Sequence, residues 1–493
     1  MPAMATPNND VLIVGSGFAG IGLAIRLAET GKRNFTILER APSLGGVWRD
    51  NTYPGVSCDV PAHLYSYSFE PNPHWSRLFA PQREILQYLE RCVDKHDVRK
   101  HIRFGCAVTG ATFDELTGLW TVQTSSGESL QGRFLVSASG HALTVPVVPK
   151  FKGAASFRGA QFHSARWDHR VDLTGKRVAV IGTGASSIQI VPAIADKVGH
   201  LTVFQRTAPW ILARRERVLS EKFQARLARF PLLQTAMRGA LYSVMESMAV
   251  GFVVDPRINK WREQYAIRHL HKQVQDPALR AKLTPQFTFG CKRVLYSDLF
   301  YPALQRPNVA LVTENIASIN ATGVVDSAGK QHDVDVIVYA TGFEAAEAAA
   351  PFAIAGRTVN GNVVDVASAW SDGIEAYLGT TISGLPNFFM MLGPNTGLGH
   401  TSMIYMMESQ MNYLLDAFAT VAQRGWSWVD VKASVQRHFN DGIQGRLKNT
   451  IWQTGCQSWY LRPDGKNTTV WPGFTFEFRN RTRHFDADNY EHG

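Results

Sequence analysis

The chain has 493 residues, of which 45% are hydrophobic, so it is long enough for two or three domains with ordinary cores. A formal net charge of +10 suits nucleic acid, an anionic membrane or a phosphorylated cofactor. Because no run of Lys and Arg is interleaved with aromatic residues, we expect no nucleic-acid partner, and an anionic dinucleotide accounts for part of the excess charge.

We expect neither a secretory leader nor a transmembrane span. The N-terminal residues MPAMATPNND lack an apolar core and a basic leader, and no run of about eighteen uncharged apolar residues occurs. The cysteines are scattered, with no C-x-x-C pair and no spacing typical of a metal site, which favours a reducing, cytoplasmic compartment. The five are Cys58, Cys92, Cys106, Cys291 and Cys456.

Residues 10–39 have the pattern of a strand, a glycine turn, a helix and a second strand. In the turn, Gly15 permits the sharp bend, Gly17 lets the backbone approach a pyrophosphate, and Gly20 lets the helix pack closely on the strand. The start of the helix offers free N–H groups to phosphates. Glu39 closes the second strand about 20 residues further on, where an acid can hydrogen-bond a ribose hydroxyl. This order of elements predicts a dinucleotide site.

The stretch FRGAQFHSARWD, residues 157–168, follows a segment rich in proline and glycine. Gly159, His163 and Trp167 stand four residues apart, a spacing that would put them on one face of a helix. The stretch has few strong helix formers and precedes a clear strand, so we expect a connector.

Residues 176–206 repeat the strand, turn, helix and strand. The turn is Gly182, Thr183 and Gly184, with Ser187 where a third glycine would stand. The second strand ends at Arg206, beside Thr207, at the position where an acid would bind a plain ribose. A guanidinium there suits a 2′-phosphate, so this repeat predicts a site for NADP(H).

Residues from about 213 to 285 have the pattern of charged helices, and the pattern of strands returns at residues 308–316 and 333–343. Within it, residues 240–254 are apolar but short and contain Glu246; we interpret them as a buried helix rather than a contact with a membrane surface. The fold class predicted is α/β, with two Rossmann-like dinucleotide-binding domains. The expected boundaries are 1–142 and 343–493 for the first dinucleotide-binding domain, 150–210 and 288–342 for the second, NADP-binding domain, and 211–287 for a helical insertion in the second.

Two dinucleotide sites in one chain indicate a flavoprotein that receives electrons from a nicotinamide. A disulfide reductase would also need a redox cysteine pair, and no such pair is evident. The fingerprint FxGxxxHxxxWD, here Phe157, Gly159, His163, Trp167 and Asp168, resembles that of type I Baeyer–Villiger monooxygenases, within the flavin-containing monooxygenase superfamily. The segments 45–69, 289–304 and 339–343 also resemble this family, and the similarity spans nearly the whole chain.

The resemblance implies that FAD and NADP(H) are the cofactors and that the fingerprint is a linker that responds to movement of the two domains. In it, His163 would be a hinge and hydrogen-bonding residue, Gly159 would permit a backbone turn, and Trp167 would anchor the linker. Lys292 would join Arg206 and Thr207 around the 2′-phosphate, Trp48 would contact the flavin, and Trp459 would lie on a mobile loop over the nicotinamide. The other residues predicted to bind a cofactor are Arg40, Gly46, Val47, Asp59, Tyr65, Val108, Ser186, Gln189, Ala340, Thr341, Gly342 and Asn395.

The resemblance also implies the chemistry. NADPH reduces FAD, the reduced flavin reacts with O2 to give a C4a-peroxyflavin, and this adds to a ketone, which becomes an ester or lactone. Arg293 would be the cation that stabilises negative charge in this step, and Asp59 would hold its guanidinium. Sulfides are further expected substrates.

Two alternatives stay open: a flavin-containing monooxygenase that oxygenates nitrogen or sulfur, and an uncoupled NADPH oxidase or flavin-binding protein. The apolar residues 242–254 hint at a hydrophobic ketone. The sequence fixes neither the ketone nor whether the chain forms a homo-oligomer.

Overall fold

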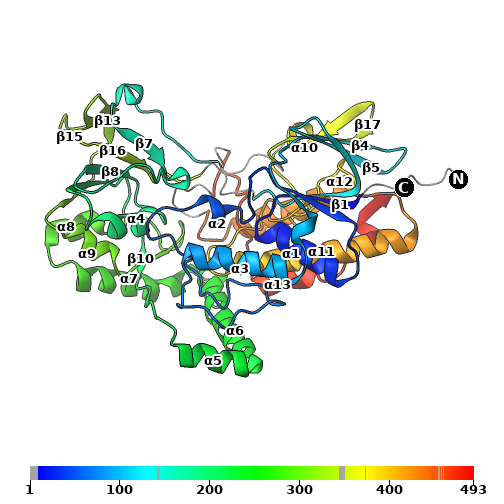
Figure 1. The fold of residues 1–493 in the computed structure, drawn as a ribbon, viewed down its shortest axis with the longest axis horizontal. Coiled ribbons are helices and arrows are strands. Elements are labelled where there is room, and N and C mark those ends of the chain that lie inside the picture. The colour runs from blue at the N-terminus through cyan, green and yellow to red at the C-terminus, as the bar shows by residue number, and fades with distance from the viewer. Residues whose placement is uncertain are drawn as a thin grey trace.

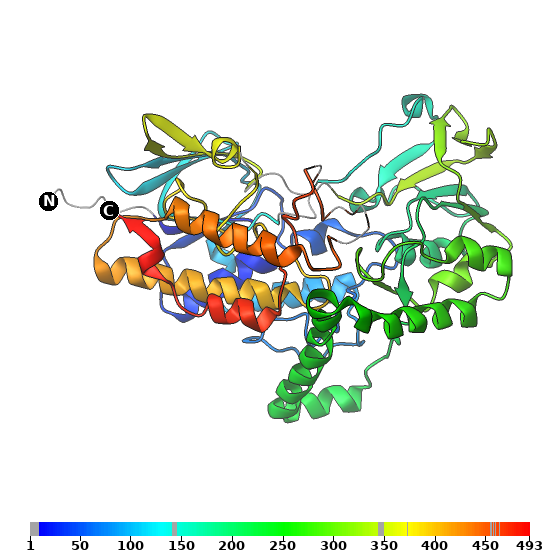
Figure 2. The same cartoon turned by 180° about the vertical axis from the view of Figure 1, so that it is seen from behind.

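The computed structural model describes residues 9–140, 145–343, 350–371, 373–453, 456, 458, 460–462 and 464–493. These residues form two lobes, each built on its own β-sheet, with a pair of helices that projects away from both (Figures 1 and 2). None of the described helices is long and apolar enough to cross a membrane.

The first sheet has nine strands within the described residues, in the order β18-β17-β4-β5-β6-β1-β2-β3, with β19 paired to β6. At its centre, β1 runs parallel to both β2 and β6, and β4, β5 and β6 form an antiparallel meander. The strands are β1 (Asn9–Val14), β2 (Phe35–Leu38), β3 (Ile102–Arg103), β4 (Val108–Asp114), β5 (Leu119–Thr124), β6 (Ser129–Ser137), β17 (Ala353–Val359), β18 (Asn362–Asp365) and β19 (Phe388–Met390).

Helices from both ends of the chain pack against this sheet (Figures 1 and 2). A Cβ on Gly22 of α1 would overlap the side chain of Met411 on α11, so the two helices approach closely where a glycine allows it. The elements of this lobe outside the sheet are α1 (Phe18–Glu29), α2 (Val47–Asp50), α3 (Gln82–Lys95), α10 (Val366–Ala369), α11 (Met403–Arg424), α12 (Ala433–Leu447), α13 (Thr475–Arg481), β20 (Val429–Val431) and β21 (Tyr490–His492).

The second sheet has the order β12-β9-β8-β16-β7, and all its neighbouring strands are parallel. Apart from the exposed Arg177 at the start of β8, the residues of β8 and β16 are hydrophobic and buried, as in parallel strands covered by helices on both faces. The elements are β7 (Ala160–His163), β8 (Arg177–Ile181), α4 (Ser187–Ile194), β9 (His200–Phe204), α9 (Phe300–Leu304), β12 (Val309–Val312) and β16 (Val336–Tyr339). Two units of this kind, each with a glycine turn after its first buried strand, are the α/β architecture that the sequence predicts.

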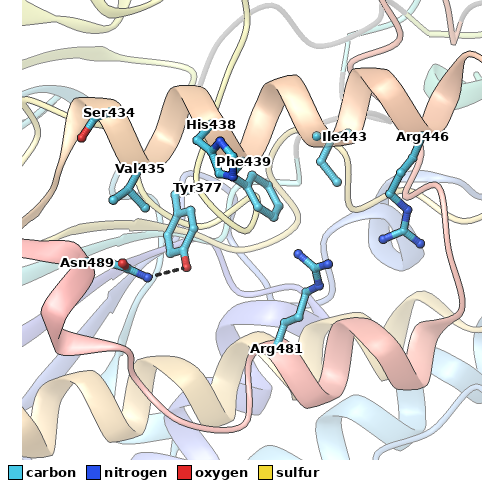
Figure 3. A pocket seen from close by; sticks show the side chains of 10 residues that line it. Tyr377, Ser434, Val435, His438, Phe439, Ile443, Arg446, Arg481 and Asn489 are labelled. Carbon is cyan, nitrogen blue, oxygen red and sulfur yellow. Dashed lines mark hydrogen bonds between the residues drawn. The ribbon is translucent and has the colours of Figure 1, made fainter.

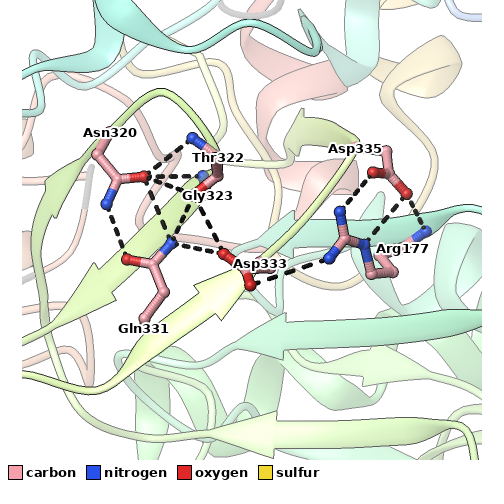
Figure 4. Close-up of polar contacts among 7 residues, drawn as sticks. All are labelled: Arg177, Asn320, Thr322, Gly323, Gln331, Asp333 and Asp335. Atoms are coloured by element: carbon pink, nitrogen blue, oxygen red, sulfur yellow. Dashed lines mark hydrogen bonds and ion pairs between the residues drawn. The ribbon is translucent and has the colours of Figure 1, made fainter.

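A small antiparallel sheet of β13 (Ile316–Ile319), β14 (Gly323–Asp326) and β15 (Gln331–Asp333) precedes β16. In its first turn, Asn320 Oδ1 accepts hydrogen bonds from the backbone N–H groups of Thr322 and Gly323, each at 3.0 Å (Figure 4). Beside it, Asp335 accepts the backbone N–H of Arg177 at 2.8 Å and its Nη2 at 2.7 Å. The contacts between Asp335, just before β16, and Arg177, the first residue of β8, align the starts of these two strands.

Between β10 (Ile211–Leu212) and β11 (Leu295–Tyr296) lie four α-helices: α5 (Glu221–Arg229), α6 (Pro231–Glu246), α7 (Lys260–Gln273) and α8 (Pro277–Leu283). The prediction that residues 240–254 form a helix holds except at Ser247, but the prediction that this helix is buried is wrong. α6 ends at Glu246, a separate π-helical turn covers Val250–Val254, and one face of α6 is exposed. The remaining short helical turns are Arg99–His101, Ala154–Ser156, Ser164–Arg166, Pro256–Asn259 and Ala487–Asn489.

The fingerprint segment is a strand as well as a connector, which corrects the sequence interpretation. Residues 160–163 form β7, the edge strand of the second sheet, in parallel register with β16 from Val336 to Tyr339. Gly159 does not adopt a positive φ angle, so it is not needed for a turn. Its Cβ would overlap the carbonyl oxygen of Asp335 and the ring of Phe157, so glycine is required here by close packing.

Two of the five cysteines form a disulfide, which corrects the expectation drawn from their scattered spacing. Cys291 and Cys456, 165 residues apart, form a disulfide, while Cys58, Cys92 and Cys106 are free. The bond joins the segment before Arg293 to the C-terminal part of the chain. The scattered spacing predicted no such pair, because sequence separation says nothing about which segments meet in space. The argument from cysteine usage for a reducing compartment is weakened accordingly.

Candidate functional site

The first glycine turn leaves its backbone open where a pyrophosphate is expected. Gly15 has a φ of +106°, and its Cβ would lie 2.6 Å from the Ala138 carbonyl oxygen. A Cβ on Gly20 would overlap the carbonyl oxygen of Gly15, so helix and turn are in close contact. A Cβ on Gly17 would meet only the Gly46 Cα, at 3.8 Å. The geometry of the turn therefore fits the pyrophosphate of a dinucleotide.

Glu39 follows β2 and is buried, as expected of the ribose-binding acid, but its carboxylate already has protein partners. Ser16 donates its backbone N–H at 2.9 Å and its hydroxyl at 2.7 Å. The other oxygen accepts the Ala41 N–H at 2.9 Å and Nη1 of Arg49 at 3.0 Å. Glu39 thus stabilises the turn itself, a role the sequence did not reveal, and its contact with a ribose stays a prediction.

The segment after β2 brings aromatic side chains beside the turn. Gly46, with a φ of +54°, precedes α2, which begins at Val47. The buried Trp48 donates its indole N–H to the Tyr65 hydroxyl at 3.1 Å, and the Tyr65 ring packs edge-on against Phe18. Arg40 is exposed and Val108 starts β4. Trp48 and Tyr65 therefore lie together, next to the helix that follows the first turn.

The second turn repeats the geometry of the first. Gly182 has a φ of +108°, and its Cβ would lie 2.5 Å from the Ala340 carbonyl oxygen, just as Gly15 meets Ala138. A Cβ on Gly184 would have no neighbour within 4 Å. Ser187, in place of a third glycine, is fully buried at the start of α4, and its neighbour Ser186 is the N-cap. This turn also fits the phosphates of a dinucleotide.

Two cations gather beside the second turn. The Thr183 hydroxyl donates to the Thr207 carbonyl at 3.1 Å, which ties the turn to the exposed Arg206. Burial and then the charge of Arg206 lower the pKa of Lys292, so the two cations are near each other. Within the described residues no carboxylate forms an ion pair with either of them. Unpaired cations at this position suit the 2′-phosphate that the sequence predicts.

The residues after β16 lie across from the second turn. The Thr341 hydroxyl donates to the Val147 carbonyl, and the Val147 N–H donates to the Gly342 carbonyl at 3.0 Å. Gly342 has a φ of +90°. The strand end at Ala340 is thereby joined to the chain that crosses between the two lobes.

Arg293 and Asp59 form the charged pair that the sequence proposes as catalytic. Nε and Nη2 of Arg293 donate to the two oxygens of Asp59 at 2.9 and 2.7 Å, a bidentate contact that fixes the plane of the guanidinium. About a third of the Arg293 side chain is exposed. The charge of Asp59 raises the pKa of Arg293, which keeps the guanidinium cationic.

Neutral groups surround this pair. Burial raises the pKa of Tyr296 to about 12 and also raises the pKa of Tyr460, although Arg293 opposes the second shift. Burial likewise raises the pKa of the Cys58 thiol. These phenols and this thiol remain protonated near neutral pH, so they add no charge to those of Arg293, Asp59 and the neighbouring Arg214.

Two contacts that sequence reasoning missed hold the segment before Asp59. Gln189 of α4 accepts from the Tyr53 hydroxyl at 3.2 Å and donates its amide to the Ser57 carbonyl at 3.0 Å. Arg214 Nη2 donates to the Ser57 hydroxyl at 3.0 Å and to the Cys58 carbonyl at 3.1 Å. Gln189 was predicted to bind a cofactor, but its side chain joins the two lobes. No local pattern in the sequence predicts the contacts of Gln189 or of Arg214.

Other predicted residues have structural partners. His163 Nδ1 accepts the Ala165 N–H at 3.1 Å, Trp167 packs edge-on against Phe162, and the half-buried Asp168 pairs with the exposed Arg170. Asn395 is buried with a φ of +56°, and its amide donates to the carbonyls of Asn467 and Val470. Trp459 lies outside the described residues.

A cavity of about 620 Å3 lies elsewhere, between α12 and the chain that follows α13 (Figure 3). It is lined by residues that include Tyr377, His438, Phe439, Arg446 and Arg481. None of its lining residues belongs to the predicted site, so the cavity does not bear on the chemistry at Arg293.

Comparison with known proteins adds independent support. The family model for flavin-binding monooxygenase-like proteins matches residues 8–353. A Baeyer–Villiger monooxygenase of Pseudomonas aeruginosa is 46% identical over 97% of this chain and 90% of its own length. One of Streptomyces coelicolor is 45% identical over 98% of this chain and 92% of its own. The crystal structure of OTEMO in complex with FAD and NADP superposes with a TM-score of 0.86 at 27% identity, covering 99% of this chain and all of that one. This similarity confirms the predicted α/β fold class.

Proposed function

The chain belongs to the flavin-binding monooxygenase-like family, and from this premise we propose that it is an NADPH- and O2-dependent Baeyer–Villiger monooxygenase that converts ketones to esters or lactones. The observation that carries the proposal is the bidentate pair of Arg293 and Asp59, with the segment before Asp59 held by Gln189 of α4, the helix that follows the second glycine turn. Bound FAD supplies the activation of oxygen, and NADPH supplies the reducing electrons.

The cofactors are assigned by the fit of the two turns. FAD would bind at Gly15, Gly17 and Gly20, with Trp48 and Tyr65 near its ring system. NADP(H) would bind at Gly182 and Gly184, with its 2′-phosphate between Arg206 and Lys292. The similar structure with FAD and NADP bound supports this assignment. Trp459 as a residue over the nicotinamide is part of the same proposal.

Arg293 would stabilise the negative charge that develops during the reaction. When a peroxide oxygen adds to a ketone carbonyl, negative charge develops on the carbonyl oxygen, and a fixed cation in a partly buried position lowers the energy of that charge. Asp59 fixes the orientation of the guanidinium through both of its oxygens. The neutral Tyr296, Tyr460 and Cys58 add no competing charge.

The test is Arg293→Ala, followed by NADPH oxidation and ester formation in the same reaction with the FAD-loaded enzyme. We expect NADPH oxidation to continue and ester formation to fall by at least about a hundredfold, the loss typical of a removed oxyanion stabiliser. Arg257→Ala is the matched control, since Arg257 is an exposed arginine whose ion-pair partner among the described residues is Asp255, in the same surface turn. Unchanged ester formation in Arg293→Ala, or equal loss of both activities, would contradict the assigned role.

An N- or S-oxygenating enzyme is the main competitor, because the family includes proteins of that kind. Sulfide turnover does not separate the two, since we propose sulfides as further substrates of this chain. A panel of cyclic, linear and aromatic ketones with detection of esters does separate them. Consumption of NADPH that yields only hydrogen peroxide with every ketone would instead indicate an uncoupled oxidase.

A disulfide reductase is excluded by the family rather than by the cysteines, because Cys291 and Cys456 are paired. A cytoplasmic location stays a prediction.

A further inference from the structure

The outer face of α6 is apolar and exposed. Leu232 is 85% exposed, Val244 is 67% exposed, and Phe230, just before the helix, is 51% exposed. Between them the exposed positions are Thr235, Ala236, Gly239, Ala240 and Ser243. Helices at a protein surface normally place charged residues on the solvent side. Here the charged residues of α6, Arg238 and Glu246, both lie on the opposite side, in contact with the body of the protein.

The inner face of α6 is firmly attached. Arg238 Nη1 donates to the carbonyls of His63 and Ser66 at 2.8 and 2.9 Å. The Tyr242 hydroxyl lies 3.0 Å from the Thr475 hydroxyl, which donates to Glu246 at 2.8 Å. The apolar outer face is therefore held in a fixed orientation.

α5 and α6 together form an arm that projects from both lobes (Figures 1 and 2). Leu227 of α5 is fully buried, and α5 is in contact with α6. The junction of the two helices, with Phe230, Leu232 and Leu233, is accordingly free to meet a flat surface.

Basic residues accompany this apolar face. Within the arm, residues 221–246, there are four Arg or Lys and two Glu, a net charge of +2. On α5, Lys222, Arg226 and Arg229 are exposed, and Arg229 lies over the ring of Phe230 at 5.5 Å. A second copy of the chain would bring the same positive charges to the contact and be repelled. A surface with anionic headgroups is complementary.

We propose that the arm formed by α5 and α6 is a contact surface for an anionic lipid bilayer. Phe230, Leu232, Leu233 and Val244 enter the boundary between headgroups and acyl chains, and Lys222, Arg226 and Arg229 meet the headgroup phosphates. α6 leads from this surface towards the candidate site, because Met248, just after it, contacts the Tyr296 hydroxyl. The inference does not depend on the proposed reaction.

The experiment is sedimentation of the full-length, FAD-loaded protein with large unilamellar vesicles. Vesicles of phosphatidylcholine with a quarter phosphatidylglycerol are compared with vesicles of phosphatidylcholine alone. We expect binding to the anionic vesicles that weakens as salt is raised. The double variant Leu232→Ser/Val244→Ser should bind about tenfold or more weakly, and Arg226→Glu/Arg229→Glu should lose the preference for anionic vesicles.

Leu116→Ser is the matched control, since Leu116 is 98% exposed in the turn between β4 and β5, away from the arm. Far-UV circular dichroism and flavin content check that each variant is folded. Equal binding of the wild type and Leu232→Ser/Val244→Ser, or no binding to anionic vesicles, would overturn the proposal. Dimers in light scattering that Leu232→Ser/Val244→Ser dissociates, without vesicle binding, would assign the face to a second copy of the chain.

Discussion

The two glycine turns depend on one backbone requirement at a single position each. Gly15 and Gly182 stand directly after apolar strands, and both adopt the positive φ angle that a sharp turn requires. The ribose contact of Glu39 stays a prediction, and its contacts with Ser16, Ala41 and Arg49 depend on how the turn folds back. The pair of Arg293 and Asp59 joins residues 234 positions apart, and only the family resemblance pointed to it.

Arg206 gives a prediction at this scale. Because it lies beside Lys292 without an acidic partner among the described residues, its charge is available to a phosphate. We expect Arg206→Ala to raise the KM for NADPH by about tenfold or more and to leave the KM for NADH nearly unchanged, the size expected for loss of a charge-assisted contact. Steady-state kinetics with both nucleotides measures this.

Lys176→Ala is the control for that variant, because Lys176 is an exposed cation at the opposite end of β8 from the glycine turn. It should leave both constants unchanged. If Arg206→Ala raised the two KM values equally, the 2′-phosphate would have to bind elsewhere.

At the scale of elements, the strands and turns of both repeats followed from the sequence, while the fingerprint and the arm did not. β7 is a strand because residues 160–163 pair with β16, some 176 positions later in the chain, and no local pattern contains that information. The four-residue spacing fits a helix face and the lack of strong helix formers favours a connector, so neither signal indicates a strand. α6 looked like a buried helix because its composition is apolar, and composition does not say which face meets the protein.

Gly159 gives the prediction for β7. A Cβ at this position would overlap the Asp335 carbonyl oxygen, part of the backbone that leads into β16, so the edge strand would have to shift. We expect Gly159→Ala to lower the free energy of unfolding by about 1–3 kcal/mol, as overpacking does. Urea unfolding followed by circular dichroism measures the change.

The control is Gly445→Ala in α12, where a Cβ would have no neighbour within 4 Å. Because alanine restricts the unfolded chain and favours a helix, this variant should gain about 0.5–1 kcal/mol. A Gly159→Ala protein as stable as the wild type would show that β7 can move without cost.

At the scale of the whole molecule, composition gave the net charge but not its location. Most of the excess lies in residues 211–287, so the two dinucleotide turns are not the main basic region. The chain also returns to its first sheet after residue 343, since β17, β18 and β19 pair there. The exact domain boundaries stay predictions. Long-range contacts such as the disulfide between Cys291 and Cys456 depend on this return and could not be predicted from spacing.

Asp430 links this returning chain to the first sheet. It is buried in β20, where it pairs with Arg357 of β17 at 2.9 Å and accepts the Gly384 N–H at 3.0 Å. Burial raises the pKa of Asp430 to about 7, although Arg357 opposes the shift. The folded state therefore binds a proton that the unfolded state, with its ordinary pKa near 3.8, has already released at pH 5.

This difference predicts how stability changes with pH. The contribution of a group whose pKa is raised on folding is complete below about pH 4 and is lost as the pH rises through about 7. The stability of the wild type relative to Asp430→Asn should therefore fall between pH 5 and pH 7, by on the order of 1 kcal/mol per pH unit. Urea unfolding of both proteins at several pH values measures the difference. Asp365→Asn is the control, because the contacts with Ser368 lower the pKa of Asp365 and its contribution is constant above pH 5. A constant difference between wild type and Asp430→Asn from pH 5 to pH 8 would mean that Asp430 stays ionised, with Arg357 compensating its burial fully.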